Sequence, residues 1–249
     1  MSFSAEEDDR YARHLVLAGV GGPGQQALKA ARVLIVGAGG LGAPLIAYLA
    51  AAGVGTLRIA DDDTVALSNL QRQIIFSIDD VGAPKVERAS AAANRMNPHT
   101  IVEAEKVRFG EATAERLLAG VTVVADGSDN AATRYAVADA CARAHIPLVS
   151  AAVHGFDGHL TTLMPYAADP KGALNPSYRC LFPDPPPDAM VDACARHGIL
   201  GAVTGVLGTL QANEVLKLIL GLGEPLVGKL LLFDARSTRF DVVHYARAT

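Results

Sequence analysis

The stretch VLIVGAGGLG at residues 33–42 decides the fold. Its first four residues are apolar, which predicts a short buried strand of a parallel sheet, and a helix is predicted behind it over Leu41–Ala52. The glycines between strand and helix match the pattern G-x-G-x-x-G with one more inside it: Gly37, Gly39, Gly40 and Gly42. Glycines let a backbone approach phosphates closely, and the start of a helix offers free N–H groups. A nucleotide-binding turn is therefore predicted, and a plain strand–helix turn is the alternative.

Strands and helices alternate outward from this stretch, between about residues 30 and 153. Further strands are predicted over 56–60, 100–104, 121–125 and 147–153, and further helices over 25–32, 84–96, 111–118 and 131–144. Such alternation predicts an α/β fold with a Rossmann-like, doubly wound and mostly parallel sheet. An extended segment over 159–164, a long helix within 199–220 and two final strands near 230–234 and 240–245 predict a C-terminal antiparallel extension.

The ends and the proline-rich middle set the predicted domain plan. Residues 1–9 are acidic and polar and are expected to form a flexible tail. Residues 165–198 are rich in proline and lack a clean period, so a long irregular connection is expected there. Without a low-complexity linker or a repeat, residues 10–249 are expected to form one domain. In the last helix Gly201, Gly205 and Gly208 recur at close-packing spacing, which predicts tight helix contact, with a subunit interface as one candidate for it.

Composition narrows the class of protein. The net charge of −4 speaks against a non-specific nucleic-acid binder. The three cysteines, Cys141, Cys180 and Cys194, lie far apart in the sequence, so a disulfide framework is not expected. The start of the chain lacks a signal peptide, and the apolar stretch at 199–220 carries polar and charged residues. No membrane association and a cytoplasmic location are therefore expected.

Charged side chains after the glycine turn choose among nucleotides. Asp61 lies 19 residues after Gly42, where a carboxylate can hold ribose hydroxyls, which fits NAD, FAD or ATP equally. Asn69, Arg72 and Lys85 then add an amide and two cations. A dehydrogenase has little use for two cations there, whereas a phosphate-transfer site does, because negative charge shifts during the reaction.

Asp129 follows the predicted strand over 121–125, at the edge where open α/β sheets bind ligands. Its carboxylate suits Mg²⁺ on the phosphates of ATP. The alternative is that Asp129 caps the helix predicted from Ala131. Both interpretations stay open at this point.

Five segments together resemble the MoeB/ThiF/HesA adenylyltransferases, which are bacterial relatives of the ubiquitin-activating enzymes. They are Arg10–His14, the glycine turn, Asp63–Gln73, Gly82–Lys85 and Asp126–Asn130, and the resemblance runs from about Arg10 to about Phe240. The resemblance implies a ubiquitin-activating-enzyme-like fold. It also implies ATP- and Mg²⁺-dependent adenylation of a ubiquitin-like sulfur-carrier protein that ends in Gly-Gly, for molybdopterin- or thiamine-type sulfur transfer. Residues of about 30–153 would bind the nucleotide and residues of about 154–249 the carrier.

The resemblance also implies a role for each matching residue. Gly40 would contact the phosphates and Asp61 the ribose; Asn69, Arg72 and Lys85 would bind phosphates and stabilise the transition state. Asp129 would hold Mg²⁺ with Asn130 beside it, and Arg13 would reach the nucleotide from the other subunit of a homodimer. The remaining cofactor-binding residues of the motif would be Ser68, Leu70 and Gln71.

Cysteine usage departs from many of these relatives, which hold zinc with two C-x-x-C pairs. Here Ser177 stands at the first cysteine of the pair that Cys180 would complete, and the chain ends without a second pair. No zinc is therefore expected. Cys194 matches a cysteine that some relatives use as a nucleophile toward the acyl adenylate, and a thiol without a catalytic part is the alternative.

Three competing functions follow from the same residues. An NAD(P)-dependent oxidoreductase would explain the glycine turn but leaves Arg72, Lys85 and Asp129 without work. A relative that adenylates a small molecule or an RNA base would use the same nucleotide site, since the fold does not fix the acceptor. A non-catalytic scaffold would not need the full set of ATP-facing residues.

Overall fold

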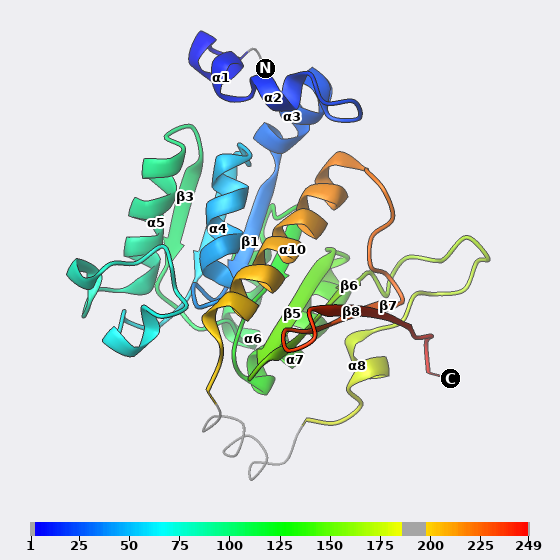
Figure 1. Ribbon diagram of the computed structural model, residues 1–249. Helices are drawn as coiled ribbons and strands as arrows, with labels where there is room; N and C mark the ends of the chain where they lie inside the picture. The colour runs from blue at the N-terminus through cyan, green and yellow to red at the C-terminus, as the bar shows by residue number, and fades with distance from the viewer. Residues whose placement is uncertain (1–2, 186–197, 249) are drawn as a thin grey trace.

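The computed structural model describes residues 3–185 and 198–248 (Figure 1). Within these residues one sheet has eight strands in the order β3-β2-β1-β4-β5-β6-β7-β8. The strands are β1 (Arg32–Val36), β2 (Thr56–Ala60), β3 (Ile101–Glu105), β4 (Val123–Asp126), β5 (Leu148–His154), β6 (Asp157–Leu163), β7 (Lys229–Asp234) and β8 (Arg239–His244). The first five strands of this order run parallel and the last three add in antiparallel fashion. The predicted Rossmann-like sheet with an antiparallel C-terminal extension is confirmed.

Helices cover both faces of the sheet. They are α1 (Ala5–Arg10), α2 (Ala12–Leu15), α3 (Gly21–Ala30), α4 (Gly42–Ala51), α5 (Lys85–Met96), α6 (Glu111–Leu118), α7 (Ala131–Ala144), α8 (Tyr178–Leu181) and α10 (Gly201–Leu220), with short 3-10 turns η1 (Leu67–Asn69) and η2 (Ile78–Asp80). One apolar cluster joins α4, α5 and α10 to the sheet, and a second joins α6 and α7 to its other face. The doubly wound layering follows from these two clusters.

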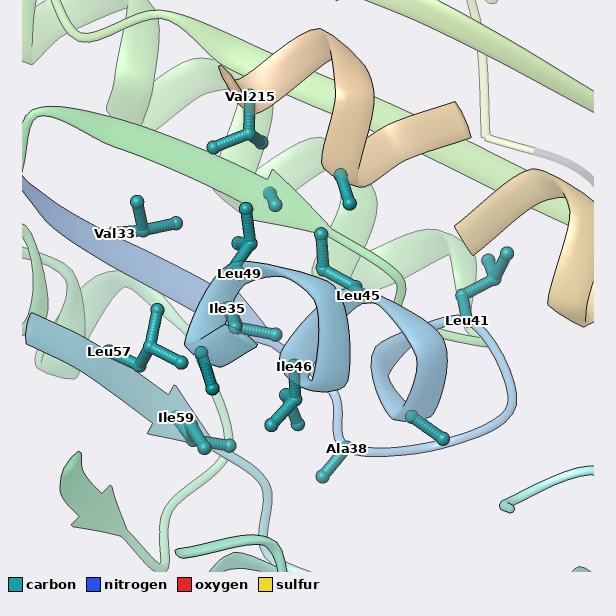
Figure 2. Close-up of a cluster of buried hydrophobic side chains, with 14 of the residues drawn as sticks. Val33, Ile35, Ala38, Leu41, Leu45, Ile46, Leu49, Leu57, Ile59 and Val215 are labelled. Atoms are coloured by element: carbon teal, nitrogen blue, oxygen red, sulfur yellow. The ribbon is translucent and has the colours of Figure 1, made fainter. Parts of the chain in front are cut away.

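Strand β1 shows why the sequence adopts this arrangement. Val33 and Ile35 point into the first cluster while Leu34 and Val36 point into the second, so a continuous apolar run is buried on both sides. Figure 2 shows Val33 and Ile35 beside side chains of β2, α4 and α10. A fully buried aliphatic side chain of this kind stabilises a fold by about 1.5–3 kcal/mol.

Helix α10 packs closely on the start of α4 and on the segment around Gln71, as two of its glycines allow. A Cβ atom on Gly208 would stand 2.5 Å from the carbonyl oxygen of Leu41, and one on Gly201 would stand 2.3 Å from that of Gln71. A Cβ on Gly205 would meet nothing within 4 Å. The predicted tight contact is therefore made inside the chain at Gly201 and Gly208. Among the described helices, α10 included, none combines the length and the apolarity needed to cross a membrane.

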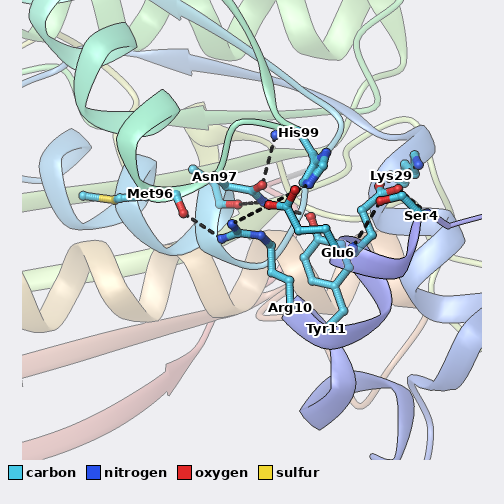
Figure 3. Close-up of polar contacts among 10 residues, drawn as sticks. Ser4, Glu6, Arg10, Tyr11, Lys29, Met96, Asn97 and His99 are labelled. Carbon is cyan, nitrogen blue, oxygen red and sulfur yellow. Dashed lines mark hydrogen bonds and ion pairs between the residues drawn. The ribbon is translucent and has the colours of Figure 1, made fainter.

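The N-terminus corrects a prediction. Instead of a loose tail over residues 1–9, the chain is helical from Ala5, because the Ser4 hydroxyl accepts a hydrogen bond from the Glu7 N–H and the Glu7 carboxylate accepts one from the Ser4 N–H. Glu7 is buried and its carboxylate lies 2.6 Å from Lys29 Nζ. Figure 3 shows the Arg10 guanidinium donating to the Met96 carbonyl over 2.9 Å. These contacts dock α1 on the rest of the molecule.

A buried amide fixes the segment between α1 and α2 in the same way. Asn97 Nδ2 donates to the Tyr11 hydroxyl over 2.9 Å (Figure 3). It also donates to the Ala50 carbonyl over 2.7 Å. Tyr11 lies against Gly53, where a Cβ would be 2.6 Å from the phenol oxygen. The first three helices therefore lie at the amino ends of β1 and β2, away from the glycine turn (Figure 1).

Candidate active site

The site lies at the carboxyl ends of β1, β2 and β4. Strand β1 has β2 on one side and β4 on the other, so the order of the strands reverses at β1. Val36 is in register with Ala60 of β2 and with Asp126 of β4. The residues after these three strands, Gly37, Asp61 and Gly127, therefore emerge together. Such a switch point forms a crevice in open α/β sheets, and ligands bind there.

The glycine turn is as tight as its sequence predicts. Gly37 has a φ of +92°, a conformation that favours glycine. A Cβ on Gly42 would stand 2.1 Å from the Gly37 carbonyl oxygen, so only glycine lets α4 start here. Within α4 the Ala43 N–H already donates to the Gly39 carbonyl over 2.9 Å, and Pro44 has no N–H, so the N–H groups available to an anion are those of the turn before Ala43. The turn therefore has the shape and the N–H groups that a phosphate would need, and Gly39 and Gly40 lie within it.

Asp61 is tied to the same turn. One carboxylate oxygen accepts the Ala38 N–H over 2.8 Å, and the other accepts the Asp63 N–H over 2.9 Å. Burial raises the pKa of Asp61, and the nearby Lys85 charge together with the two N–H donors opposes that rise. These two hydrogen bonds hold the carboxylate in place beside the glycine turn.

Lys85 is the first residue of α5 and is buried. Its Nζ lies 2.8 Å from a carboxylate oxygen of the exposed Asp63. A buried ammonium group needs such a partner. Asp63 holds Lys85 near Asp61, so the structure brings these two predicted site residues together.

The segment from Ser68 to Gln73 forms η1 and the turn after it. The Arg72 guanidinium donates to the Ser68 carbonyl over 3.1 Å, and the Asn69 carboxamide oxygen accepts the Ala66 N–H over 3.1 Å. Leu70 packs against the core cluster with its side chain, so its predicted place in the cofactor site is limited to its backbone. Gln73, to which the sequence assigned no role, is buried, and its Oε1 has no partner within the described residues.

Asp129 and Asn130 have different roles, which the sequence alone did not distinguish. The Asn130 side chain caps α7 by accepting the Thr133 N–H over 2.9 Å. The alternative in which Asp129 caps this helix is therefore wrong. Asp129 is exposed, with the Asn130 amide 3.4 Å from one of its oxygens. Its carboxylate is placed to bind a cation in the crevice, and an exposed oxygen ligand fits Mg²⁺.

Close to Asp129 lies a second carboxyl group, that of Asp126, to which the sequence analysis assigned no role. Asp126 is buried, one of its oxygens accepts the Ser128 N–H over 2.9 Å, and the other has no partner in the part of the chain described. Burial raises its pKa, which the Arg134 charge opposes. Its main-chain carbonyl accepts a hydrogen bond from the buried Gln211 amide of α10 over 2.9 Å. A lone Asp at the end of an apolar strand gave no sign of this.

Two predicted catalytic residues are not part of this crevice in the single chain. Arg13 is exposed on α2, at the amino ends of the strands and thus at the opposite edge of the sheet. Cys194 lies outside the described residues.

A groove of about 460 Å³ lies beside the Arg72 segment. It is lined by His154, Gly155, Phe156, Asp157, Gly198, Ile199, Leu200 and Arg236. The Arg236 guanidinium stands 4.4 Å from the centre of the Phe156 ring. The Ile199 carbonyl on its rim accepts a hydrogen bond from Gln71 Nε2 over 3.5 Å, so the groove borders the nucleotide segment. The residues of the β5–β6 turn that line this groove come directly before the segment 159–164, for which the sequence predicts an extended conformation.

The C-terminal segment reaches the cysteine loop without a second cysteine pair. Cys180 Sγ lies 3.4 Å from the Ser177 hydroxyl and accepts the Ala248 N–H over 3.4 Å. Burial alone would raise the pKa of Cys180, but these hydrogen bonds outweigh it and the pKa is lowered. Arg247 closes the contact by donating to the Asn175 and Pro165 carbonyls over 3.2 Å each. Hydrogen bonds thus join the loop and the terminus here.

Known proteins resemble this chain over nearly its full length. The chain is 46% identical to the "SAMP-activating enzyme E1" of Haloferax volcanii over 245 residues, and 44% identical to the "Sulfur carrier protein adenylyltransferase" of Thermus thermophilus over 240. These matches cover 98% and 96% of the chain and 88% of each relative. It is 49% identical to the "Adenylyltransferase and sulfurtransferase MOCS3" of Bos taurus, covering 99% of the chain and 52% of that longer protein.

Solved structures share the fold. Escherichia coli MccB matches with a TM-score of 0.82 at 22% identity, covering 97% of this chain and 71% of that one. PaaA matches with a TM-score of 0.79 at 23% identity, covering 99% and 76%. The ThiF family matches residues 11–249, which include every segment of the crevice described above. This chain therefore belongs to the ThiF family.

Proposed function

We propose that this protein uses ATP and Mg²⁺ to adenylate the C-terminal glycine carboxylate of a small ubiquitin-like sulfur-carrier protein. What carries this proposal is the gathering of a phosphate cradle, a fixed carboxylate and two cations at one edge of the sheet: Gly37–Gly42, Asp61, Arg72 and Lys85. A nicotinamide site has no need of that charge. The relatives from Haloferax volcanii and Thermus thermophilus, of which this chain covers 88% each, are named "SAMP-activating enzyme E1" and "Sulfur carrier protein adenylyltransferase", and these names support the choice of acceptor.

In this proposal each group has a physical task. The N–H groups of the glycine turn around Gly40 hold phosphate oxygens at the start of α4, and Asp61 accepts hydrogen bonds from the ribose hydroxyls. Asp129 holds Mg²⁺, which shields the charge of the phosphates, and Asn130 positions Asp129 through its amide. Ser68, Asn69, Leu70 and Gln71 shape the backbone that presents Arg72.

The reaction needs little proton chemistry. A carboxylate oxygen of the terminal glycine forms a bond to the α-phosphorus while the bond to the bridging oxygen breaks, and pyrophosphate leaves with that electron pair. A glycine carboxylate is already ionised at neutral pH, so no general base is required. Arg72 and Lys85 stabilise the negative charge that moves onto the α-phosphate and the leaving group. Catalysis is therefore positioning plus charge stabilisation.

The acceptor would reach the α-phosphate along the groove beside Arg72. A Gly-Gly tail is narrow and flexible, and the groove runs between the β5–β6 turn and the start of α10. Its rim carries both apolar and charged groups, with Arg236 lying over Phe156. The carrier's folded part would then rest on the C-terminal strands.

A homodimer completes the proposed site. Arg13 lies too far from the crevice in its own chain, at the opposite edge of the sheet, so it would serve the partner subunit's nucleotide. Cys194 stays a proposed nucleophile toward the acyl adenylate. The pathway, molybdopterin- or thiamine-type sulfur transfer, would follow from the carrier.

The test is carrier-dependent exchange of labelled pyrophosphate into ATP, using small proteins that end in Gly-Gly and the same proteins without the last glycine. We expect exchange that requires both Mg²⁺ and the terminal glycine. Tight ATP binding without exchange for any carrier would contradict the carrier as acceptor and favour a small-molecule or RNA acceptor. A change of NADH absorbance with substrate would favour an oxidoreductase.

We also propose that no structural zinc is bound, because Ser177 and Ala248 occupy the surroundings of Cys180. Elemental analysis of the purified protein should give far less than one zinc per chain. One equivalent of zinc, lost together with thermal stability on chelation, would refute this.

A further inference from the structure

The first turn of α10 touches both segments that carry the proposed nucleotide-binding groups. A Cβ on Gly201 would stand 2.3 Å from the Gln71 carbonyl oxygen and 3.3 Å from the Cα of Arg72. The backbone of Gly201 is helical and lies outside the left-handed region, so glycine is not required by conformation. Glycine in a helix costs up to about 1 kcal/mol relative to alanine. The close approach to the Arg72 segment is therefore what calls for glycine here.

One turn further along, the same face reaches the glycine turn. A Cβ on Gly40 would stand 2.9 Å from the Thr204 methyl carbon, so this methyl group closes the space beside the phosphate cradle. The Thr204 hydroxyl donates back to the Gly201 carbonyl over 2.7 Å, which turns the methyl group toward Gly40. The start of α10 thus bears on Gly40 and on Arg72 at once.

Helix α10 is fixed well enough to act as a reference for these segments. The Gln211 amide, buried completely, donates to the Asp126 carbonyl over 2.9 Å and to the Val149 carbonyl over 3.0 Å. These bonds pin the helix to the ends of β4 and β5. On the other side of the contact between α10 and residues 71–72, the Arg72 guanidinium has one hydrogen-bond partner among the described residues, the Ser68 carbonyl. A displacement of the 71–72 backbone would therefore carry the guanidinium with it.

We infer that Gly201 is a positioning residue for the nucleotide site: it lets α10 seat against the Gln71 carbonyl and so sets where Arg72 meets the phosphates. This inference rests on the proposed phosphate-binding role of Arg72. Gly201 itself touches no phosphate, and it acts through the backbone of residues 71–72. Gly205, one turn further on, has open space around it and offers a matched control.

The experiment is a double-mutant cycle in the affinity for Mg²⁺–ATP, measured by titration calorimetry on the purified full-length protein. It compares the wild type, Gly201→Ala, Arg72→Ala and the double variant, with Gly205→Ala as control. We expect Gly201→Ala to weaken binding about tenfold in the wild-type background and less than about twofold in the Arg72→Ala background. Gly205→Ala should bind like the wild type. A purely structural role would give equal losses in both backgrounds.

Each result separates the inference from the proposed function. Unchanged affinity in Arg72→Ala would remove the phosphate role of Arg72, and the inference with it. A loss in Arg72→Ala but none in Gly201→Ala, or equal losses for Gly201→Ala in both backgrounds, would overturn the inference alone. If Gly201→Ala fails to fold, Gln71→Ala is a gentler test of the same packing: it keeps the Gln71 carbonyl but removes the side-chain bond to the Ile199 carbonyl, which also joins the 71–72 segment to the start of α10. Its loss must then also vanish in the Arg72→Ala background.

Discussion

At the scale of single residues, the pair Asp129–Asn130 shows how neighbouring side chains separate stability from chemistry. Asn130 satisfies the start of α7, and Asp129 is left exposed to the crevice. Both types are good helix caps, so the sequence alone could not decide which one does it. The backbone decides, because Asn130 has the extended conformation that a cap requires.

Substituting each of these two residues by alanine should separate their roles. We expect Asp129→Ala to abolish pyrophosphate exchange while its free energy of unfolding stays within about 0.5 kcal/mol of the wild type. Asn130→Ala should lower the free energy of unfolding by about 1 kcal/mol, because α7 loses its cap. Urea denaturation and the exchange assay measure the two effects. Normal exchange in Asp129→Ala would exclude it as the Mg²⁺ ligand.

Asp126 leads to a prediction about pH. Its pKa is raised in the folded protein, so the folded state binds a proton more tightly than the unfolded state does. The stability tied to that proton is fully present below the unfolded pKa of about 3.9 and is lost as the pH rises through the folded value.

Asp126→Asn keeps the oxygen that accepts the Ser128 N–H but carries no charge. We therefore expect the ligand-free variant to be more stable than the wild type at pH 8, with the difference shrinking as the pH falls toward 4. Urea denaturation across this pH range measures it. A difference that does not change with pH would show that the charge of Asp126 is not its cause.

At the scale of elements, the sequence predicted helices and strands best where the hydrophobic period agreed with the residues that end an element, such as glycine and proline. The predicted helices over 111–118 and 131–144 and the predicted strand over 56–60 have the observed bounds. The same agreement placed Asp61, Lys85 and the glycine turn together, because parallel strands bring their carboxyl ends to one edge. Contacts across the fold were out of reach: that Gly201 meets Gln71 depends on where α10 crosses the sheet, and the sequence shows only the spacing of small residues.

Helix α1 was missed for a different reason. Its capping signal, Ser4 followed by Glu7, is present in the sequence, but the acidic run around it is equally typical of a solvated tail. Its docking depends on Lys29 of α3, a partner 22 residues away. The pKa of Glu7 is lowered, first by the hydrogen bond with Lys29 and then by the Ser4 N–H. Its ionised form thus stabilises α1 above the unfolded pKa, and that stability is lost as the pH falls through the folded value.

Glu7→Gln should therefore loosen α1 at neutral pH. We expect a loss of about 1 kcal/mol at pH 7 that fades below about pH 4, where the wild type is protonated as well. Amide hydrogen exchange of residues 5–10 reports the local opening. Asp8→Asn removes the same charge from an exposed position and serves as control. Equal effects of the two variants would mean that net charge matters here and the contact with Lys29 does not.

At the scale of the whole molecule, the sheet separates two functional ends. The nucleotide crevice lies at the carboxyl ends of the strands, and the docked helices that carry Arg13 lie at the amino ends. If Arg13 takes part in the site as proposed, it must come from a neighbouring copy of the chain. The proposed role of Arg13 and the proposed homodimer therefore stand or fall together.

Mixing two inactive variants tests these two proposals together. Arg13→Ala and Arg72→Ala subunits, allowed to exchange, should regain up to about a quarter of wild-type exchange activity, because half of the dimers are mixed and each has one intact site. Arg13→Ala mixed with Lys85→Ala should recover likewise. Arg72→Ala mixed with Lys85→Ala should show no recovery, since both changes lie in the crevice of one chain and a mixed dimer then has no intact site. No recovery in the first mixture, despite proven subunit exchange, would contradict the shared site.

The last strand of the sheet has a consequence for handling the protein in solution. Strand β8 ends the sheet, and Phe240, Val242 and Val243 are each 48% exposed on it. An apolar strand at the edge of a sheet is a template for aggregation. In β8 the charged side chains of Arg239 and Asp241, which form an ion pair, oppose the pairing of this edge with another chain. Solubility should therefore depend on these two charges: removing either is expected to increase self-association through this edge, which light scattering of the purified protein would measure.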